Sequence, residues 1–360
     1  MALNDRIFYA CKAVAIVPKT GGSIASTGIP VRGLQSVGMS STFNLEQIFE
    51  IGQLEIYENV EEVADIEVTL EKVIDGRALL FQLTSNGECA TGGDGLAAAA
   101  KNQCDVYLAI YQDTDTDAAG GTLTNICWNS GMYTSSVSYN YSVDGNATES
   151  VTLVGNDRFW NDVDGGAGAA DDTAVDALFT GVLDNLDVPL ASGVVRRVDV
   201  DLAGSSLPAI VKSQVGDKGP LGGDAGGNYH IQSISVSADF GQENLLELGR
   251  FGPYAKFTTF PIEVSSEFEV IATSGDLVSV SGANKNLGSG EQITIKDNAG
   301  TVLNLGNKNK LSSVSYSGGD TGGGNATITY SFVTYNSLIV DGGNATANES
   351  NAGSDGISKA

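Results

Sequence analysis

One stretch of this sequence occurs twice, and the repeat restricts the possible folds more than any other feature. The first copy, LEQIFEIGQLEIYENVEEVADIEVTLEKV, covers residues 45–73, and a weaker copy, QENLLELGRFGPYAKFTTFPIEVSSEFEV, covers residues 242–270. A second pair follows in the same order, VSYNYSVDGNAT at 137–148 and VSYSGGDTGGGNAT at 314–327. Two ordered matches indicate that a whole domain has been duplicated.

The alignment also matches single residues of the two copies. Phe43 aligns with Phe240 and Tyr57 with Tyr254 at one constant spacing. After a one-residue shift, segment 66–69 (IEVT) aligns with segment 262–265 (IEVS). We therefore expect two superposable domains near residues 32–155 and 229–340. One undivided sheet would contradict that expectation.

Both copies alternate apolar and polar residues, which is the pattern of a β-strand with one buried face. Segment 66–71 (IEVTLE) alternates strictly, and Val264, Phe268 and Val270 continue one face in the second copy. Helix propensity favours short helices at 96–101 and 174–186. The predicted fold class is mainly β, with two tandem sandwich or barrel domains and short flanking helices.

Shifts in composition divide the chain into five segments. Residues 161–188 contain seven aspartates and no Lys or Arg, which is typical of a linker or a surface insertion. The last twenty residues are rich in Gly, Asn and Ser, so we expect them to be exposed. The predicted organisation is an N-terminal arm at 1–31, a first domain at 32–155, an acidic insertion and linker at 156–228, a second domain at 229–340 and a flexible tail at 341–360.

The charge balance excludes one large class of function. With 19 basic and 44 acidic residues the chain has a formal net charge of −25, whereas specific nucleic-acid binding needs a basic face. No basic segment precedes the short apolar run at the start, and no apolar run approaches the ~20 residues of a membrane helix. We expect synthesis in the cytoplasm, without a signal peptide or a membrane anchor.

The four cysteines do not form a recognisable metal or redox motif. Cys11, Cys89, Cys104 and Cys127 contain no C-x-x-C pair, and the chain has a single histidine. A zinc site would therefore need an unusual ligand set. We expect reduced and mostly buried thiols.

No catalytic constellation is visible either. His230 has no nucleophile and no orienting acid beside it, so a structural role is favoured over a catalytic one. Glu67 and Glu71 share one face of a strand, but a glycosidase needs two carboxyls across an aromatic-lined cleft. The glycine-rich segments 216–223 and 318–327 lack the G-K-[ST] of a phosphate loop, which favours turns. We expect no enzyme activity and no cofactor.

One acidic loop leaves two interpretations open. Asp113, Asp115 and Asp117 reproduce the first half of a calcium-loop pattern. The pattern then fails, because Ala118 replaces the required Gly and Thr124 replaces the required Glu. A solvated acidic loop is the favoured interpretation, and a calcium site is the alternative.

Segment 33–76, GLQSVGMSSTFNLEQIFEIGQLEIYENVEEVADIEVTLEKVIDG, resembles the tail tube proteins of long-tailed bacteriophages. The likeness lies in LEQIFEIGQ, IYEN, DIEVTLEKVIDG and the later TESVTLVGND at 148–157, and it covers the first copy better than the second. The resemblance implies a β-sandwich or barrel with a flanking helix. In that family neighbouring subunits join their sheets into an inner β-barrel, and rings stack into a tube through which DNA passes.

The resemblance implies a structural virion protein of the phage tail, assembled in the host cytoplasm. An acidic channel would repel DNA phosphates, so DNA would pass without specific binding. The polar face of the alternating strands either lines the channel or is an ordinary solvated surface. The lumen-facing candidates are Glu67, Thr69 and Glu71 of the first copy and Glu263, Ser265, Glu267 and Glu269 of the second.

The expected partners are further copies of the chain and other tail proteins, such as a sheath, baseplate or terminator. Rings of this family generally contain six tube domains. A chain with two such domains closes the ring as a trimer with pseudo-sixfold symmetry, which we favour over a hexamer. The alternative functions are a baseplate hub or distal tail adaptor, and a secreted adhesin or surface-layer module.

Overall fold

The chain is mainly β, as the alternation predicts. The computed structural model describes residues 7–20, 23–24, 29–85, 94–111, 123–162, 193–213, 229–273, 275–278, 290–319, 321 and 323–342. Most of the acidic insertion, the helix expected at 174–186, the calcium-like loop and nearly all of the C-terminal tail lie outside these residues. The short helix expected at 96–101 is confirmed as α2, Leu96–Ala99.

Corresponding strands occur in the same order along the chain in both copies. The first copy contributes β4 (Leu34–Thr42), β5 (Leu45–Phe49), β6 (Ile56–Glu61), β7 (Asp65–Val73), β9 (Gln103–Tyr111), β10 (Leu123–Ser142) and β11 (Thr148–Gly155). The second contributes β13 (Ile231–Asp239), β14 (Gln242–Leu245), β15 (Ala255–Thr258), β16 (Glu263–Ile271), β19 (Lys310–Ser317) and β20 (Thr327–Tyr335).

Shorter elements surround these strands. They are the 3-10 helix η1 (Tyr9–Cys11), the strands β1 (Lys12–Thr20), β2 (Ser23–Ile24), β3 (Ile29–Pro30), β8 (Asp94–Gly95), β12 (Asp157–Asp162), β17 (Thr294–Lys296), β18 (Val302–Asn304) and β21 (Ile339–Asp341), and the helices α1 (Leu80–Ser85) and α4 (Ala209–Ser213).

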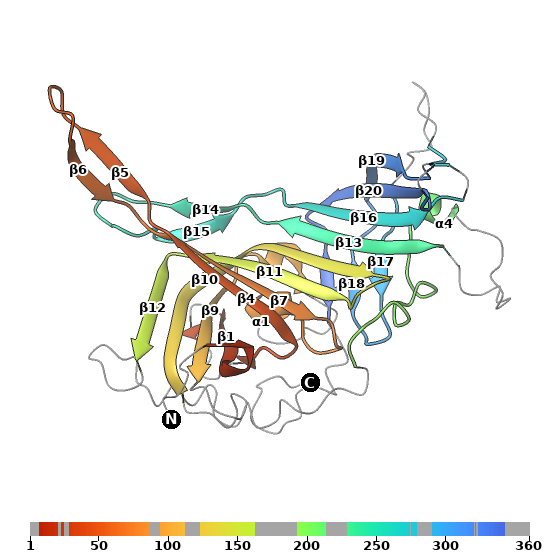
Figure 1. The fold of residues 1–360 in the computed structure, drawn as a ribbon, viewed down its shortest axis with the longest axis horizontal. Coiled ribbons are helices and arrows are strands. Elements are labelled where there is room, and N and C mark those ends of the chain that lie inside the picture. The colour runs from red at the N-terminus through yellow and green to blue at the C-terminus, as the bar shows by residue number, and fades with distance from the viewer. Residues whose placement is uncertain are drawn as a thin grey trace.

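The eight long strands form one continuous sheet rather than two (Figure 1). Its order is β19-β20-β16-β13-β10-β11-β7-β4. The expectation of two separate domain sheets was wrong, because β10, at the edge of the first half-sheet, pairs with β13, at the edge of the second. Within each half the order is nevertheless the same: β4-β7-β11-β10 corresponds to β13-β16-β20-β19.

A serine–glutamate hydrogen bond occurs at equivalent positions in the two halves. The Ser36 hydroxyl donates to Glu71 Oε2 at 3.2 Å, and the Ser233 hydroxyl donates to Glu269 Oε2 at 3.1 Å. Both pairs lie beside an irregularity at the same place in the ladder, between β4 and β7 and between β13 and β16. Glu71 therefore corresponds to Glu269. The sequence alignment of these two strands was wrong by two residues, a shift that keeps every side chain on its face.

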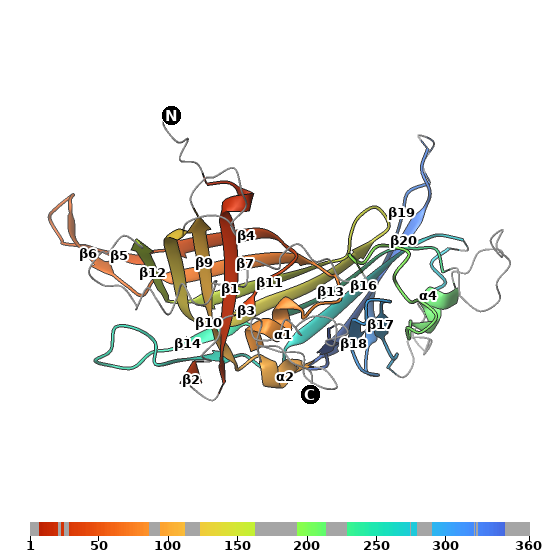
Figure 2. The same ribbon diagram turned by 90° about the horizontal axis from the view of Figure 1, so that it is seen from below.

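The first copy has a second layer, and β10 belongs to both layers. Its second half pairs with β11 and β13, while its first half pairs with β9 and β12. Strand β9 in turn pairs with β1, whose Ala15 and Ile16 are fully buried. The segment expected as an N-terminal arm thus supplies a core strand. Figure 2 shows β1, β9 and β12 running across the direction of β4 and β7.

The second copy is covered by a small sheet of different origin. Its order is β17-β18-β21-β8, and β8 comes from the first copy. Residues 193–213, from the expected linker, connect the two halves as well. The Val195 amide donates to Ile74 O at 2.8 Å, and the Ser206 amide donates to Thr294 O at 2.8 Å. Buried residues of both copies form one apolar core beneath the long sheet.

Candidate assembly surfaces

The seven lumen candidates lie on one exposed face of the long sheet. In β7, Glu67, Thr69 and Glu71 alternate with buried residues. In β16, Glu263, Ser265, Glu267 and Glu269 alternate with buried residues in the same way. The continuous sheet brings the two groups to the same side. From β7 to β16, each strand pairs in a register that places residues of this face opposite residues of the same face.

This face is acidic, and small hydroxyl side chains surround its carboxylates. On the eight strands it carries seven carboxylates and one lysine; these are Asp65, Glu67, Glu71, Asp239, Glu263, Glu267, Glu269 and Lys310. The Ser331 hydroxyl donates to Glu267 Oε1 at 3.2 Å, and the hydroxyls of Ser237 and Ser265 lie 2.8 Å apart. Hydroxyl donors are neutral and do not cancel the charge of the carboxylates that they contact, so the face presents a negative potential.

The opposite, inward face holds a buried carboxylate that the sequence analysis missed. Glu149 is fully buried and accepts the backbone amides of Leu80 at 2.5 Å and Phe81 at 3.0 Å, at the start of α1. Its cross-strand neighbour Lys72 is also buried and donates to Ala78 O at 2.6 Å. Burial raises the pKa of Glu149, while the two amides and Lys72 act in the opposite direction. This pair fixes α1 to the sheet.

Two hairpins project from the long sheet, and they follow equivalent strands (Figure 1). Strands β5 and β6 form the first and β14 and β15 the second. We call them arm 1 and arm 2. The apolar side chains Ile51 and Leu54 at the tip of arm 1 are about fully exposed, at 103% and 102%, and Leu248 of arm 2 reaches 105%. Exposed apolar groups at such density are typical of an interaction surface.

Arm 2 belongs to the second copy, and its base is fixed against the first copy. The Thr258 hydroxyl donates to Ala100 O at 2.9 Å, and the Gln242 side-chain amide donates to Thr134 O at 2.7 Å. The Lys101 ammonium lies 5.9 Å from the centre of the Phe260 ring. The two copies are therefore joined by these side-chain contacts as well as by the backbone pairing of β10 with β13.

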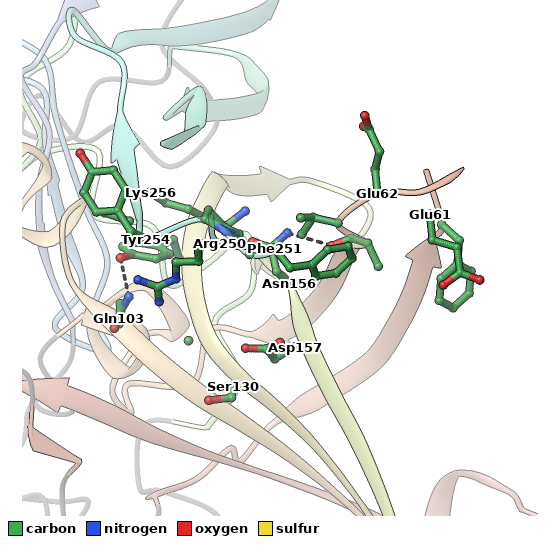
Figure 3. A pocket seen from close by; sticks show the side chains of 18 residues that line it. Glu61, Glu62, Gln103, Ser130, Asn156, Asp157, Arg250, Phe251, Tyr254 and Lys256 are labelled. Atoms are coloured by element: carbon green, nitrogen blue, oxygen red, sulfur yellow. Dashed lines mark hydrogen bonds between the residues drawn. The ribbon is translucent and has the colours of Figure 1, made fainter. Parts of the chain in front are cut away.

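A groove of about 570 Å³ lies between the base of arm 1 and the distal loop of arm 2. Figure 3 shows Arg250 and Tyr254 on one side and Glu61 and Glu62 on the other. Burial lowers the pKa of Lys256, which also lines the groove, and Asp65 opposes that shift. Its lining contains no His and no Cys.

The remaining sequence candidates do not form a site either. His230 precedes β13 with a left-handed φ of 51°, and its carbonyl oxygen accepts the side-chain amide of Gln232 at 3.2 Å. Cys11, Cys104 and Cys127 are buried free thiols, as expected, and Cys89 lies outside the described residues. In the described part of the chain, no group of three or more potential ligands could hold a metal, and no helix is long and apolar enough to cross a membrane.

No protein-family model matches this chain, and no curated protein matches it. Among solved structures, a chain of the anti-feeding prophage baseplate, 6-fold symmetrised, is 11% identical with a TM-score of 0.32, covering 44% of this chain and 97% of that one. A chain of the tube-terminating cap of the anti-feeding prophage is 13% identical with a TM-score of 0.32, covering 45% and 95%. The crystal structure of Hcp protein is 10% identical with a TM-score of 0.24, covering 42% and 98%. Likenesses this distant assign no function, so a function has to be inferred from the surfaces of the chain itself.

Proposed function

We propose that this chain is a tail tube subunit of a phage particle, a structural protein without enzymatic activity or cofactor. Its rings stack into a channel for the genome. The observation that carries the proposal is the long sheet, which has one acidic, hydroxyl-rich face and, among the described residues, a strand with a free outer edge at each end. Such a sheet is suited to line a wall, because its two ends can be joined to neighbouring copies.

The chemistry of the acidic face suits the passage of DNA. Phosphate groups bind to Lys and Arg side chains, and seven carboxylates against one lysine oppose such contacts. Short serine and threonine side chains protrude little from the strands. A face of this kind keeps the duplex solvated and lets it slide without specific contacts.

Three chains per ring are favoured over six. The strands of the second copy continue the sheet of the first, so both copies would line the same wall. A trimer then presents six equivalent half-sheets with pseudo-sixfold symmetry. In the competing arrangement, six chains form the ring and only the first copy lines the channel. Exposed arms 1 and 2 are suited to contact the next ring or other tail proteins, such as a sheath, baseplate or terminator.

Charge reversal on the acidic face tests the channel role. The double substitution Glu67→Lys and Glu71→Lys should leave rings and tubes intact, because both side chains are solvent-facing. Genome ejection should slow about tenfold or more, since new ammonium groups bind phosphates. The measurement is the rate of DNA release from particles carrying the variant.

The matched control is Asp144→Lys, in the exposed turn between β10 and β11, which should eject DNA at the parent rate. Unchanged ejection by the double variant would remove the channel role. Negative-stain images of the purified chain separate the remaining functions. Long tubes support a tube subunit, single rings favour a hub or distal adaptor, and monomers favour an adhesin or surface-layer module.

A further inference from the structure

The joint between the two copies contains the detailed geometry of a strand-to-strand interface. Strands β10 and β13 pair antiparallel from Ser136↔Asp239 to Ser142↔Ser233. Beyond the ladder, the Phe240 amide donates to Ser135 O at 2.8 Å. The Phe240 ring packs 5.9 Å from the ring of Phe81 and is 0% exposed. The interface is thus a ladder with an aromatic anchor at one end.

The two free edges of the sheet are the counterparts of these two strands. In the described part of the chain, β4 pairs only with β7, and β19 only with β20. Strand β4 corresponds to β13 through the matching irregularities and serine–glutamate bonds. Strand β19 corresponds to β10, because the ladder with the next strand skips one residue at Ser135 in one half and at Ser312 in the other.

The apolar residues that the joint buries remain exposed at the free edges. Phe43, the counterpart of Phe240, is 73% exposed instead of 0%. Tyr316, the counterpart of Tyr139, is 55% exposed instead of 0%. A groove of about 720 Å³, lined by Tyr9, Leu34 and Val37 among others, runs beside the first half of β4. Each free edge therefore has the side chains of an interface but not the partner.

Neither edge has the usual protection against pairing. Natural edge strands carry charges, prolines or bulges along their length. Strand β4, LQSVGMSST, contains no charge and no proline, and β19, KLSSVSYS, contains one lysine at its start. Their ladder irregularities lie near one end, which leaves the middle of each edge regular. Such edges are adapted to accept another strand.

We infer that β19 of one chain pairs with β4 of a second copy in the register of the β10–β13 joint. Val314 then lies opposite Ser41, Ser315 opposite Ser40, and Tyr316 opposite Met39. The Phe43 amide donates to the Ser312 carbonyl of the neighbouring chain, and the Phe43 ring becomes buried there. The partner must be another copy, because β4 and β19 lie at opposite ends of one sheet. This inference deepens the proposed function and rests on it.

A cysteine pair tests the register. Ser40 and Ser315 are exposed, and their counterparts Ser237 and Ser138 face each other in the joint. Their backbone groups point away from the new ladder, so they form a close, non-hydrogen-bonded pair suited to a disulfide. The double variant Ser40→Cys with Ser315→Cys should give reducible, covalently linked multimers under oxidation. The control Ser36→Cys with Ser315→Cys, four residues out of register, should give at least about tenfold less.

A second variant tests the anchor. Phe43→Glu leaves the isolated chain intact, because the ring is mostly exposed. It should raise the protein concentration needed for half-maximal ring assembly about tenfold or more, since a buried aromatic anchor is lost. Its circular dichroism and thermal unfolding should match the parent.

The outcomes of these experiments distinguish the β19–β4 pairing between chains from the proposed tube function. Linked multimers in the first cysteine variant alone support the register. Tubes that form without linkage, or with equal linkage in the control, overturn the register and leave the tube function standing. Linkage into rings that never stack supports the register and contradicts the tube function. A chain that stays monomeric and unlinked under oxidation at high concentration overturns the inference.

Discussion

Neighbouring glutamates of this sheet have opposite environments, and the position of each residue in its strand decides which. Glu71 faces solvent and accepts a serine hydroxyl, whereas Glu149, one strand away, is buried and accepts two amides. Lys72 and Glu149 occupy positions in β7 and β11 where the alternation calls for apolar side chains. That departure from the pattern is the signal by which the sequence could have identified them.

Glu149 should make the stability of the chain depend on pH. Because burial raises its pKa in the folded state, folding takes up a proton at this site. Its favourable contribution is fully present below the ordinary glutamate pKa of about 4.3 and is lost as pH rises through the raised folded value. The parent should therefore lose stability relative to Glu149→Gln over this window, by at most about 1.4 kcal/mol per pH unit.

Urea unfolding of both proteins from about pH 4, near the ordinary glutamate pKa, up to about pH 8 measures that difference. Glu58→Gln, on the exposed β6 strand, is the matched control and should differ little from the parent at every pH. A constant difference between the parent and Glu149→Gln would contradict the buried, raised carboxyl.

At the scale of elements, the bend in β10 decides how the first copy closes. The strand runs for 20 residues and changes partners near Gly131, whose φ is 65°. Asp105 of β9 accepts the Gly131 amide at 2.7 Å and pairs with the Lys19 ammonium at 2.8 Å, so three segments meet at one carboxylate. The register of β10 against β9 shifts between Asn129 and Met132, and this bulge redirects the strand from one layer to the next.

Asp105→Ala should destabilise the fold by about 3–5 kcal/mol, because it leaves a partly buried lysine without its carboxylate partner and removes the acceptor of the Gly131 amide. Denaturant unfolding at pH 7 measures the loss. Asp144→Ala, in an exposed turn, is the control and should change stability by less than about 0.5 kcal/mol. A similarly small effect for Asp105→Ala would show that Gly131 alone sets the bend.

At the scale of the whole molecule, the two half-sheets are joined edge to edge in the same strand order, which is the arrangement expected of repeated units in a ring. The joint inside the chain and the proposed joint between chains use equivalent strands, so every half-sheet would meet its neighbours in the same way. Duplication followed by fusion also allows the two halves to diverge. Arm 2 is fixed against the first copy at its base, whereas the apolar side chains at the tip of arm 1 are exposed.

The mass of one ring distinguishes the two stoichiometries. A trimer of this chain has a mass of about 111 kDa, which is three times 37.1 kDa, and a hexamer has twice that. We expect the trimer, with threefold symmetry and a pseudo-sixfold outline in end-on images. Native mass spectrometry of rings released from tubes gives the mass directly, and a ring of six chains with true sixfold symmetry would contradict it.

The sequence by itself determined the local features. Alternation in 66–71 and 263–270 identified strands and the face of each side chain, because the period of two follows from strand geometry alone. Repetition of the segments predicted the duplication, and the matching strand order of the two half-sheets agrees with the repeat. The continuity of the sheet, the pairing of β10 with β13 and the core position of β1 came only from the tertiary structure. Strand pairing depends on which edges meet across long separations, and a two-residue shift in alignment leaves the same hydrophobic pattern, so no local signal specifies it.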